Sequence, residues 1–530
     1  MKKIGFKNFR RFSELSPLPI GRLTLLSGGN NSGKSTIVKA AMLVINYLKT
    51  PTDNSNTLVN MLQYRKFFFD IENVHVSSFI RGINNNCDPN SEGIIFNLQL
   101  GNFAIDIEVK HSESVSSSYG YVSCIYIDDR ERKIKYNFIF DGIPSMTMTI
   151  DFSNDDDNEN HDDIEDFSKE ITDLEEFTKT SKDFQAIAQA NERLNIIKAK
   201  QQQIEGRANR LNPIFTFPLS QFSDNQNPFF VTQLMASFVG LANTKDSSKE
   251  EEKKNKNAKQ YIKSREKDIA LSILSLVDEI SSYKFEYIAA HSASQRAFYT
   301  TYDSSDYTAQ TVHSFFNSGV AQSDVNGCIE IVQDDSKELS IPEKLLLKYM
   351  QVFSIGSGIR IMSYNNESYT VDIIDASSKS MPLADKGMGA IQLTILLLRI
   401  IFLFKRYEYT SRKPIILVEE PEQNLHPKTQ SLLADFFFEI STAYKFQVLV
   451  ETHSEYLVRK MQVLFASKIK EKEQDEETLN GLIKVYFFPE NKSPYSMTFQ
   501  KNGRFENTFD PGFFDEAGRW NRELNKLERL

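Results

Sequence analysis

The chain has 530 residues, of which 40% are hydrophobic and 25% are charged, and its formal net charge at pH 7 is −9. This length exceeds what one ordinary core holds, so we expect one composite domain with insertions, or two to three domains. The composition is that of a globular chain, and the negative charge excludes a protein-wide basic field for nucleic acid while leaving a local basic groove open.

Cysteine usage and hydropathy indicate the cellular compartment. Cys87, Cys124 and Cys328 are scattered and form no C-x-x-C pair, which argues against a disulfide framework or a zinc site. The N-terminus lacks the apolar run of a signal peptide. The longest apolar stretch, residues 391–404, is short for a membrane span and contains Arg399, so it predicts a buried core helix. We therefore expect a cytoplasmic protein without a membrane partner.

The first segment, residues 1–150, is expected to form an N-terminal lobe. Residues 4–12 favour an edge strand, residues 23–26 a short buried strand, and residues 37–48 a helix free of Gly and Pro. Alternating apolar and polar residues then predict an antiparallel β-layer. Its expected strands are residues 94–100, 103–109, 122–127 and 133–140.

The second segment, residues 151–282, reads as a helical and charged insertion. It holds an acidic run at 155–163, helix-forming sequence at 183–210 and a charge-dense run at 249–256. These runs indicate solvated linkers. The acidic run lacks the Gly and spacing of a calcium loop, which disfavours a calcium site. A helical hairpin that engages a partner or DNA stays open.

The third segment, residues 283–530, is expected to form a C-terminal lobe. The expected core strands are residues 287–290, 414–418 and 446–450, because they are short, apolar and rich in β-branched side chains. Helices are expected over residues 387–404 and 427–442, the latter with Pro at its start. A hairpin of residues 485–488 and 495–499, followed by a tail, closes the chain.

One glycine-rich loop carries the most specific motif. Residues 28–36 follow the pattern G-x-x-x-x-G-K-[ST], preceded by an apolar strand and followed by a helix. In such a P-loop the backbone N–H groups face phosphate oxygens, the Lys pairs with the β- and γ-phosphates, and the Ser hydroxyl binds Mg²⁺. We expect ATP and Mg²⁺ as cofactors, with Ser35 as a metal ligand. The expected nucleotide-binding residues here are Gly28, Asn30, Asn31, Ser32, Gly33, Lys34, Ser35 and Thr36.

Two further strands end in polar residues. The strand at 415–418 is followed by Glu419 and Glu420, a Walker B arrangement. Glu419 is expected to hold the Mg²⁺ hydration shell and Glu420 to orient and deprotonate the attacking water. The next core strand delivers His453, whose neutral imidazole can hydrogen-bond the γ-phosphate or the attacking water. Glu420 and His453 are therefore the predicted catalytic residues.

A second phosphate cradle is predicted where small residues enter the helix at 387. Asp385, Lys386, Gly387 and Gly389 are its expected nucleotide contacts. Because one chain has only one γ-phosphate to hold, this cradle is most useful if it caps the ATP of a partner chain.

These motifs, in this order, resemble the ABC-type heads of SMC-like AAA ATPases and of the overcoming-lysogenization-defect (OLD) family. Residues 8–12, 287–290, 383–389 and 420–427 carry the resemblance, and residues 510–516 resemble the tail of a bacterial subgroup. It implies an α/β fold, a P-loop head with a mixed sheet and an antiparallel β-layer, split by a helical insertion. Three features depart from it: Asp385-Lys386 replaces the usual Ser, Glu419 replaces Asp, and only Gln63 offers itself as a Q-loop glutamine.

The resemblance also implies a function. Such heads dimerise head to tail around ATP, so we expect a slow or partner-stimulated ATPase, a homodimer or higher oligomer. It would be the sensor or motor of a bacterial anti-phage, anti-plasmid or DNA-repair complex, with a separate nuclease or toxin as effector and nucleic acid as an open partner. The alternatives are a repair ATPase unrelated to defence and an OLD-like nuclease in one chain. The stretch after His453 is too short for a Toprim nuclease domain and lacks an Asp-x-Asp pair, which disfavours the latter.

Overall fold

The computed structural model describes most of the chain outside the middle segment. The described residues are 1–52, 64–72, 74–111, 118–142, 145–152, 214–218, 228–242, 259–290, 293–302, 306–334, 338–410, 414–490 and 492–527. The predicted helix at 183–210, the charged runs at 155–163 and 249–256, and Gln63 lie outside them.

Two compact units emerge from the backbone contacts. The first consists of Met1, Lys3–Pro17 and Leu43–Ser281, and the second of Lys2, Leu18–Met42 and Ser282–Leu530. The P-loop therefore groups with the C-terminal half of the chain. The three-part division at residues 150 and 282 stays a prediction.

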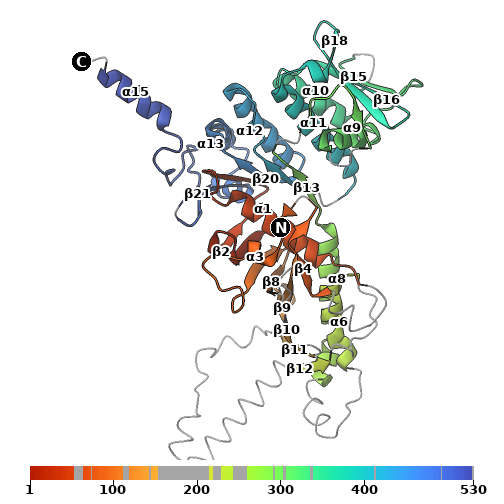
Figure 1. The fold of residues 1–530 in the computed structure, drawn as a ribbon, viewed down its shortest axis with the longest axis vertical. Helices are drawn as coiled ribbons and strands as arrows, with labels where there is room; N and C mark the ends of the chain where they lie inside the picture. Colours follow the sequence, from red (N-terminus) through yellow and green to blue (C-terminus); the bar gives the residue numbers. More distant parts are fainter. Residues whose placement is uncertain are drawn as a thin grey trace, which may run out of the picture. The chain divides into compact units, whose positions relative to one another are not determined.

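The first unit is built on an antiparallel sheet (Figure 1). Its expected strands are confirmed, and burial alternates along them with period two, as in β7 and β8. In sheet order the strands are β12 (Ile214–Pro218), β11 (Ser145–Phe152), β10 (Ile134–Gly142), β9 (Tyr119–Asp129), β8 (Phe103–Lys110), β7 (Ile94–Leu100), β1 (Lys3–Phe9) and β2 (Phe12–Pro19), with β4 (Lys66–Phe68) beside β9.

The first unit also holds two longer helices and several short elements. The helices are α6 (Phe230–Ala242) and α8 (Glu266–Ser282), and the short elements are β5 (Asp70–Ile71), β6 (Val74–His75) and α3 (Phe79–Gly82). The strand predicted at residues 4–12 is confirmed as β1 over Lys3–Phe9, but its expected place at a sheet edge is wrong, because β1 lies between β7 and β2. The chain turns at Arg10, whose φ is 54°, and β2 begins at Phe12.

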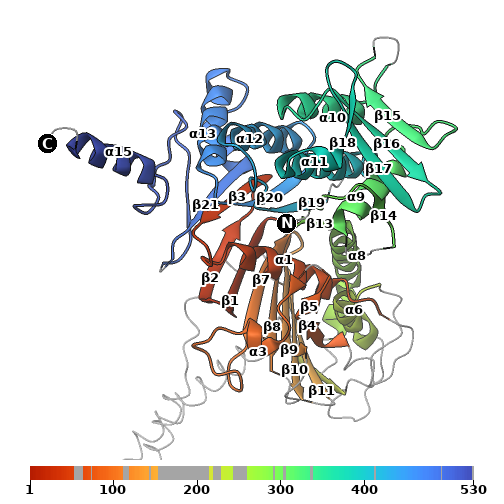
Figure 2. The same ribbon diagram turned by 45° about the horizontal axis from the view of Figure 1, so that its top comes forward.

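A mainly parallel sheet organises the second unit (Figure 2). The first five strands run parallel, and the last is antiparallel to its neighbour, which agrees with the expected closing hairpin. All six residues of the strand before the P-loop are buried, as a central strand requires. The order is β13 (Phe285–Ile288), β19 (Ile415–Glu419), β20 (Gln447–Thr452), β3 (Leu23–Gly28), β21 (Ile483–Phe488) and β22 (Tyr495–Ser496).

Three helices follow the strands of this sheet. α1 (Lys34–Leu48) begins directly after the P-loop, α12 (Pro427–Thr442) follows the Walker B strand, and α13 (Glu455–Lys470) follows β20. Ser454 caps α13 by accepting a hydrogen bond from the N–H of Leu457 at 3.1 Å. The switch from strand to helix is therefore fixed at the residue after His453.

A second, antiparallel sheet lies in the same unit, with three helices packed beside it (Figure 2). α11 (Met388–Arg406) contacts both α9 (Tyr307–Phe316) and α10 (Ile341–Val352). It is long and apolar enough to cross a membrane by length and composition alone, but its apolar residues are largely buried within the unit, as predicted for a core helix. The sheet is β14 (Tyr299–Thr300), β17 (Ser368–Ile374), β16 (Gly358–Tyr364) and β15 (Cys328–Val332), with β18 (Ser380–Pro382) beside β17.

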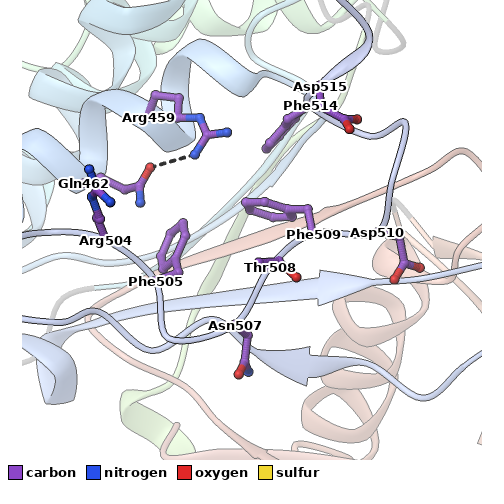
Figure 3. A pocket seen from close by; sticks show the side chains of 10 residues that line it. All are labelled: Arg459, Gln462, Arg504, Phe505, Asn507, Thr508, Phe509, Asp510, Phe514 and Asp515. Carbon is purple, nitrogen blue, oxygen red and sulfur yellow. Dashed lines mark hydrogen bonds between the residues drawn. The ribbon is translucent and has the colours of Figure 1, made fainter. Parts of the chain in front are cut away.

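The C-terminal tail covers α13 with aromatic side chains before it ends in α15 (Glu516–Leu527). Phe499 stacks on Phe465 of α13 with ring centroids 4.4 Å apart. A cavity of about 560 Å³ lies between α13 and this tail. Figure 3 shows the side chains that line it, among them Arg459 and Phe514, whose guanidinium carbon and ring centroid are 5.8 Å apart.

Replacing Leu25, a fully buried residue of β3, tests the central position of that strand. We expect Leu25→Ala to lower the free energy of unfolding by about 2–5 kcal/mol, because it leaves a cavity between tightly packed neighbours. Urea unfolding followed by circular dichroism measures this. Leu524→Ala, at a side chain that is 57% exposed, is the control and should leave the midpoint unchanged. Equal midpoints for both variants would contradict the assignment of β3 as the core strand.

Candidate functional site

The predicted site residues meet at one edge of the parallel sheet. β3, β20 and β19 are neighbours, and the register aligns Ser27 with Thr452 and Glu419 with Glu451. Because the strands are parallel, the loops that leave their carboxyl ends open at the same edge, where ligands bind in open α/β sheets. The glycine loop, the two Walker B carboxylates and His453 all lie on these loops or at these strand ends.

The glycine loop has a conformation that its sequence requires. A Cβ atom on Gly28 would come within 2.4 Å of the Phe488 carbonyl oxygen, so only glycine fits there. Gly33 and Asn31 have φ values of 100° and 58°, in the left-handed region that turns the loop back on itself. The Thr36 N–H donates to the Gly33 carbonyl at 3.1 Å, which joins the loop to the first turn of α1.

Lys34 lies inside the loop. Its Nζ donates hydrogen bonds to the carbonyl oxygens of Gly28 at 3.2 Å and Gly29 at 2.8 Å, and it is 3.8 Å from Glu451 Oε1. Burial lowers the pKa of Lys34, while the carboxylates of Glu451 and Glu420 act in the opposite direction. Backbone oxygens of the loop therefore hold the ammonium group in place.

Ser35 contacts a residue that is far from it in the sequence. Its hydroxyl donates to Glu451 Oε1 at 2.9 Å. The Glu451 side chain is only 7% exposed, and this burial raises its pKa to about 7, although Lys34 and Ser35 favour the charged form. Ser35 and a carboxylate of the neighbouring strand thus form one group at the sheet edge.

The two Walker B carboxylates leave β19 in different directions. Glu419 is the last residue of the strand and accepts a hydrogen bond from the Tyr287 hydroxyl, whose pKa is raised by burial and by this contact. Glu420 has φ 43°, an uncommon value for a residue with a side chain. Its N–H donates to the Glu451 carbonyl at 2.8 Å, and its carboxylate accepts from Gln423 Nε2. The two carboxylates therefore have different partners, Tyr287 for Glu419 and Gln423 for Glu420.

His453 lies against Glu420. Its Nε2 is 3.4 Å from Glu420 Oε1, and burial, followed by the charge of Lys34, lowers the pKa of the imidazole. The His453 N–H donates to Glu422 Oε1 at 2.6 Å, and Glu422 is itself buried, which raises its pKa. Glu422 therefore fixes the backbone that presents His453.

The second predicted cradle lies elsewhere in the unit. Gly387 is the N-cap of α11, and the space around its Cα is open. Lys386 Nζ is 3.5 Å from the Ile355 carbonyl oxygen, and a Cβ atom on Gly389 would come within 2.7 Å of the Asn424 carbonyl oxygen. Among the described contacts, this cradle, exposed Asp385 included, touches the loop after Glu420 and not the P-loop.

A sequence comparison decides the family. The profile of the AAA ATPase domain matches residues 1–458, well over half of the chain. The chain belongs to the AAA ATPase domain family. Comparison with curated proteins finds no match. The predicted AAA ATPase class and the α/β P-loop head fold are confirmed, while the relation to the OLD family stays a prediction.

Solved structures similar to this AAA ATPase include SMC heads. The Smc head of Pyrococcus furiosus, with an extended coiled coil and bound to the C-terminal domain of ScpA, is 12% identical, covers 99% of each chain and has a TM-score of 0.29. The SMC head of Thermotoga maritima is 10% identical over 94% of this chain and 98% of that one, with a TM-score of 0.30. At these scores the family assignment depends on the sequence match alone.

Two orphaned polar atoms test whether this AAA ATPase suits a nucleotide with its cation. The Ser32 hydroxyl lies buried in the loop, and Glu451 Oε2 lies buried beside Ser35, each without a hydrogen-bond partner in the described structure. Buried polar groups normally have partners. A phosphate oxygen at Ser32 and a divalent cation at the carboxylates would supply them, so the residues present fit Mg·ATP.

Sequence reasoning missed three residues of this site, namely Glu422, Gln423 and Glu451. Glu422 and Gln423 belong to the E-E-P-E-Q-N run, and their closeness in sequence to Glu420 was the available signal. Glu451 directly precedes the Thr-His pair at the end of a core strand, where a buried acidic residue is unusual. The polarity of both stretches was visible, but their partners were not.

The raised pKa of Glu451 predicts a pH-dependent effect of Glu451→Gln on stability. A folded-state pKa near 7 means that the folded chain binds this proton more tightly than the unfolded chain, so the contribution of Glu451 falls between about pH 4.5 and pH 7. We expect wild type and Glu451→Gln to melt alike at pH 4.5, and the variant to gain up to about 3 kcal/mol over wild type by pH 7.5. Thermal melts across this pH range without nucleotide measure the difference, and a pH-independent gap would contradict it.

Proposed function

We propose that this AAA ATPase domain binds Mg·ATP at the P-loop and hydrolyses it to ADP and phosphate. The convergence of Lys34, Ser35, Glu419, Glu420 and His453 at one edge of one parallel sheet supports this. A cation bound at Ser35 and Glu419 would neutralise charge on the β- and γ-phosphates. The buried Lys34 ammonium lies where it can pair with the same oxygens.

Glu420 is the proposed general base. Its carboxylate takes a proton from the attacking water as the water oxygen bonds to the γ-phosphorus and the bond to the β,γ-bridging oxygen breaks. Burial keeps the His453 imidazole neutral, so its ring can hydrogen-bond the water or the γ-phosphate. Gln423 holds the Glu420 side chain, and Glu422 holds the backbone that presents His453.

The second phosphate cradle suggests a second copy of the chain as partner. The N-terminus of α11 is open, and a helix N-terminus attracts anions. Around it lie Asp385, Lys386, Gly387 and Gly389. Their described contacts lead away from the P-loop of the same chain, so the γ-phosphate they would hold belongs to another copy. The proposed unit of hydrolysis is a head-to-tail homodimer.

The proposed role is the sensor or motor of a cytoplasmic bacterial defence or DNA-repair complex whose effector is a separate protein. The resemblance of the motifs to SMC-like and OLD heads supports this role. The OLD-like nuclease alternative stays a prediction, and the genes beside this one are the observation that tests the effector.

Replacing Lys34 tests nucleotide binding. Wild type at a hundredfold excess of Mg·ATP over its dissociation constant should gain about 2.7 kcal/mol of stability. Lys34→Ala should gain no stability from Mg·ATP, because the loop loses the buried ammonium group that would pair with the phosphates. Differential scanning fluorimetry with and without Mg·ATP measures this, and Lys501→Ala, at an exposed lysine in the tail, is the matched control. A ligand-induced shift in Lys34→Ala equal to that of wild type would refute the site.

Replacing Glu420 tests hydrolysis and assembly together. Glu420→Gln keeps the size of the side chain and removes the base, so hydrolysis should slow by about 10²–10⁴-fold. The ATP-bound dimer should then persist and be visible by light scattering. The double variant with Lys34→Ala should return to the monomer, since it has no nucleotide to trap. A Glu420→Gln protein that hydrolyses ATP at the wild-type rate would exclude Glu420 as the base.

A further inference from the structure

Glu451 has no role in the mechanism above, yet it touches both key side chains of the P-loop. Its Oε1 accepts the Ser35 hydroxyl at 2.9 Å and lies 3.8 Å from Lys34 Nζ. Lys34 is closer to the carbonyl oxygens of Gly28 and Gly29, at 3.2 and 2.8 Å, so neutralising Lys34 is not the main function of this carboxylate. Ser35 is its direct partner.

The second oxygen of Glu451 points to a missing ligand. Oε2 is buried and has no hydrogen-bond partner in the part of the chain that the structure describes. An unpaired buried polar atom costs roughly 1–3 kcal/mol, so a further ligand at Oε2 would be stabilising. An oxygen left open beside the Ser35 hydroxyl is the arrangement that a hard cation uses.

Glu419 lies next to Glu451. The two residues are in register on the parallel strands β19 and β20, so their side chains leave the same face of the sheet, with the strands about 4.8 Å apart. Two carboxylates at this separation repel each other in a buried setting, and a divalent cation between them removes the repulsion. The electrostatics therefore favour a shared cation over two independent acids.

We propose that Glu451 is a protein ligand of the divalent cation that accompanies ATP, together with Ser35 and Glu419. The proposal rests on the Mg·ATP site proposed above. Two carboxylates and a hydroxyl are a small protein ligand set, and Mg²⁺ typically takes one or two carboxylates and completes its shell with substrate phosphates and water. The hydrogen bond from Ser35 to Glu451 keeps these two side chains side by side for the cation.

Manganese binding tests the proposal without measuring hydrolysis. Mn²⁺ is titrated into the chain saturated with the β,γ-imido analogue of ATP, and free Mn²⁺ is followed by electron paramagnetic resonance. We expect Glu451→Gln to weaken Mn²⁺ binding by at least about tenfold. Its affinity for the nucleotide in EDTA should stay within a factor of about two to three of wild type, because Lys34 and the loop are intact. Glu455→Gln, an acid four residues further on in α13, is the matched control and should bind Mn²⁺ as wild type does.

A change of ligand type gives a second, independent readout. Glu451→Cys replaces a hard oxygen by a soft thiolate, so the site should come to prefer Cd²⁺ over Mn²⁺. Cd²⁺ should then support nucleotide binding in this variant better than in wild type, whereas Glu455→Cys should show no such gain. This experiment decides the question if Glu451→Gln fails to fold.

The outcomes separate this inference from the proposed function. If wild type binds no nucleotide, the proposed ATP site itself fails. If wild type binds Mn²⁺ with nucleotide, and Glu451→Gln binds it equally well or Glu451→Cys gains no preference for Cd²⁺, the ATP site stands and Glu451 is not a ligand of the cation.

Discussion

The register of three parallel strands is the constraint on which this structure depends. β19, β20 and β3 pair so that Glu419 meets Glu451 and Thr452 meets Ser27. Because side chains alternate along a strand, a slip of one residue would turn Glu451 to the other face of the sheet. The hydrogen bond to Ser35 would then be lost. The chemistry at the sheet edge is thus specified by the buried apolar residues that fix the register.

The sequence was most informative where function needs a local pattern. The P-loop, the two acids after the strand at 415–419 and the histidine after the next strand are each recognisable within about ten residues. The alternation in β7 to β10 likewise predicted the antiparallel layer. The pairing of Ser35 with Glu451 was out of reach, because the two residues are 416 positions apart and only the fold joins them. The strand expected at residues 4–12 is present but ends at Phe9, where the chain turns, and its place inside the sheet depends on its pairing with residues 94–100.

The electrostatic balance of the site is unusual. Glu451, Glu420 and Glu422 act on the buried ammonium of Lys34, and Glu419 lies beside Glu451. A triphosphate would add further negative charge to this group. Burial keeps the pKa of Glu451 and Glu422 high, and neighbouring carboxylates act in the same direction. The excess of negative charge means that a cation, and charge from outside this chain, would contribute strongly to a stable nucleotide complex.

The short loop from Pro421 to Leu425 links the two halves of the proposed machinery. Its Glu422 holds the backbone of His453. Its Pro421 carbonyl accepts a hydrogen bond from Gln392, and its Asn424 packs against Gly389 of α11. In a head-to-tail dimer, the contact through Glu422 would respond to the nucleotide bound by the same chain. The contacts with α11 would respond to the nucleotide bound by the other chain. Occupancy of one site would then alter the affinity of the other, and ATP binding would become cooperative, with a sigmoidal dependence on ATP concentration.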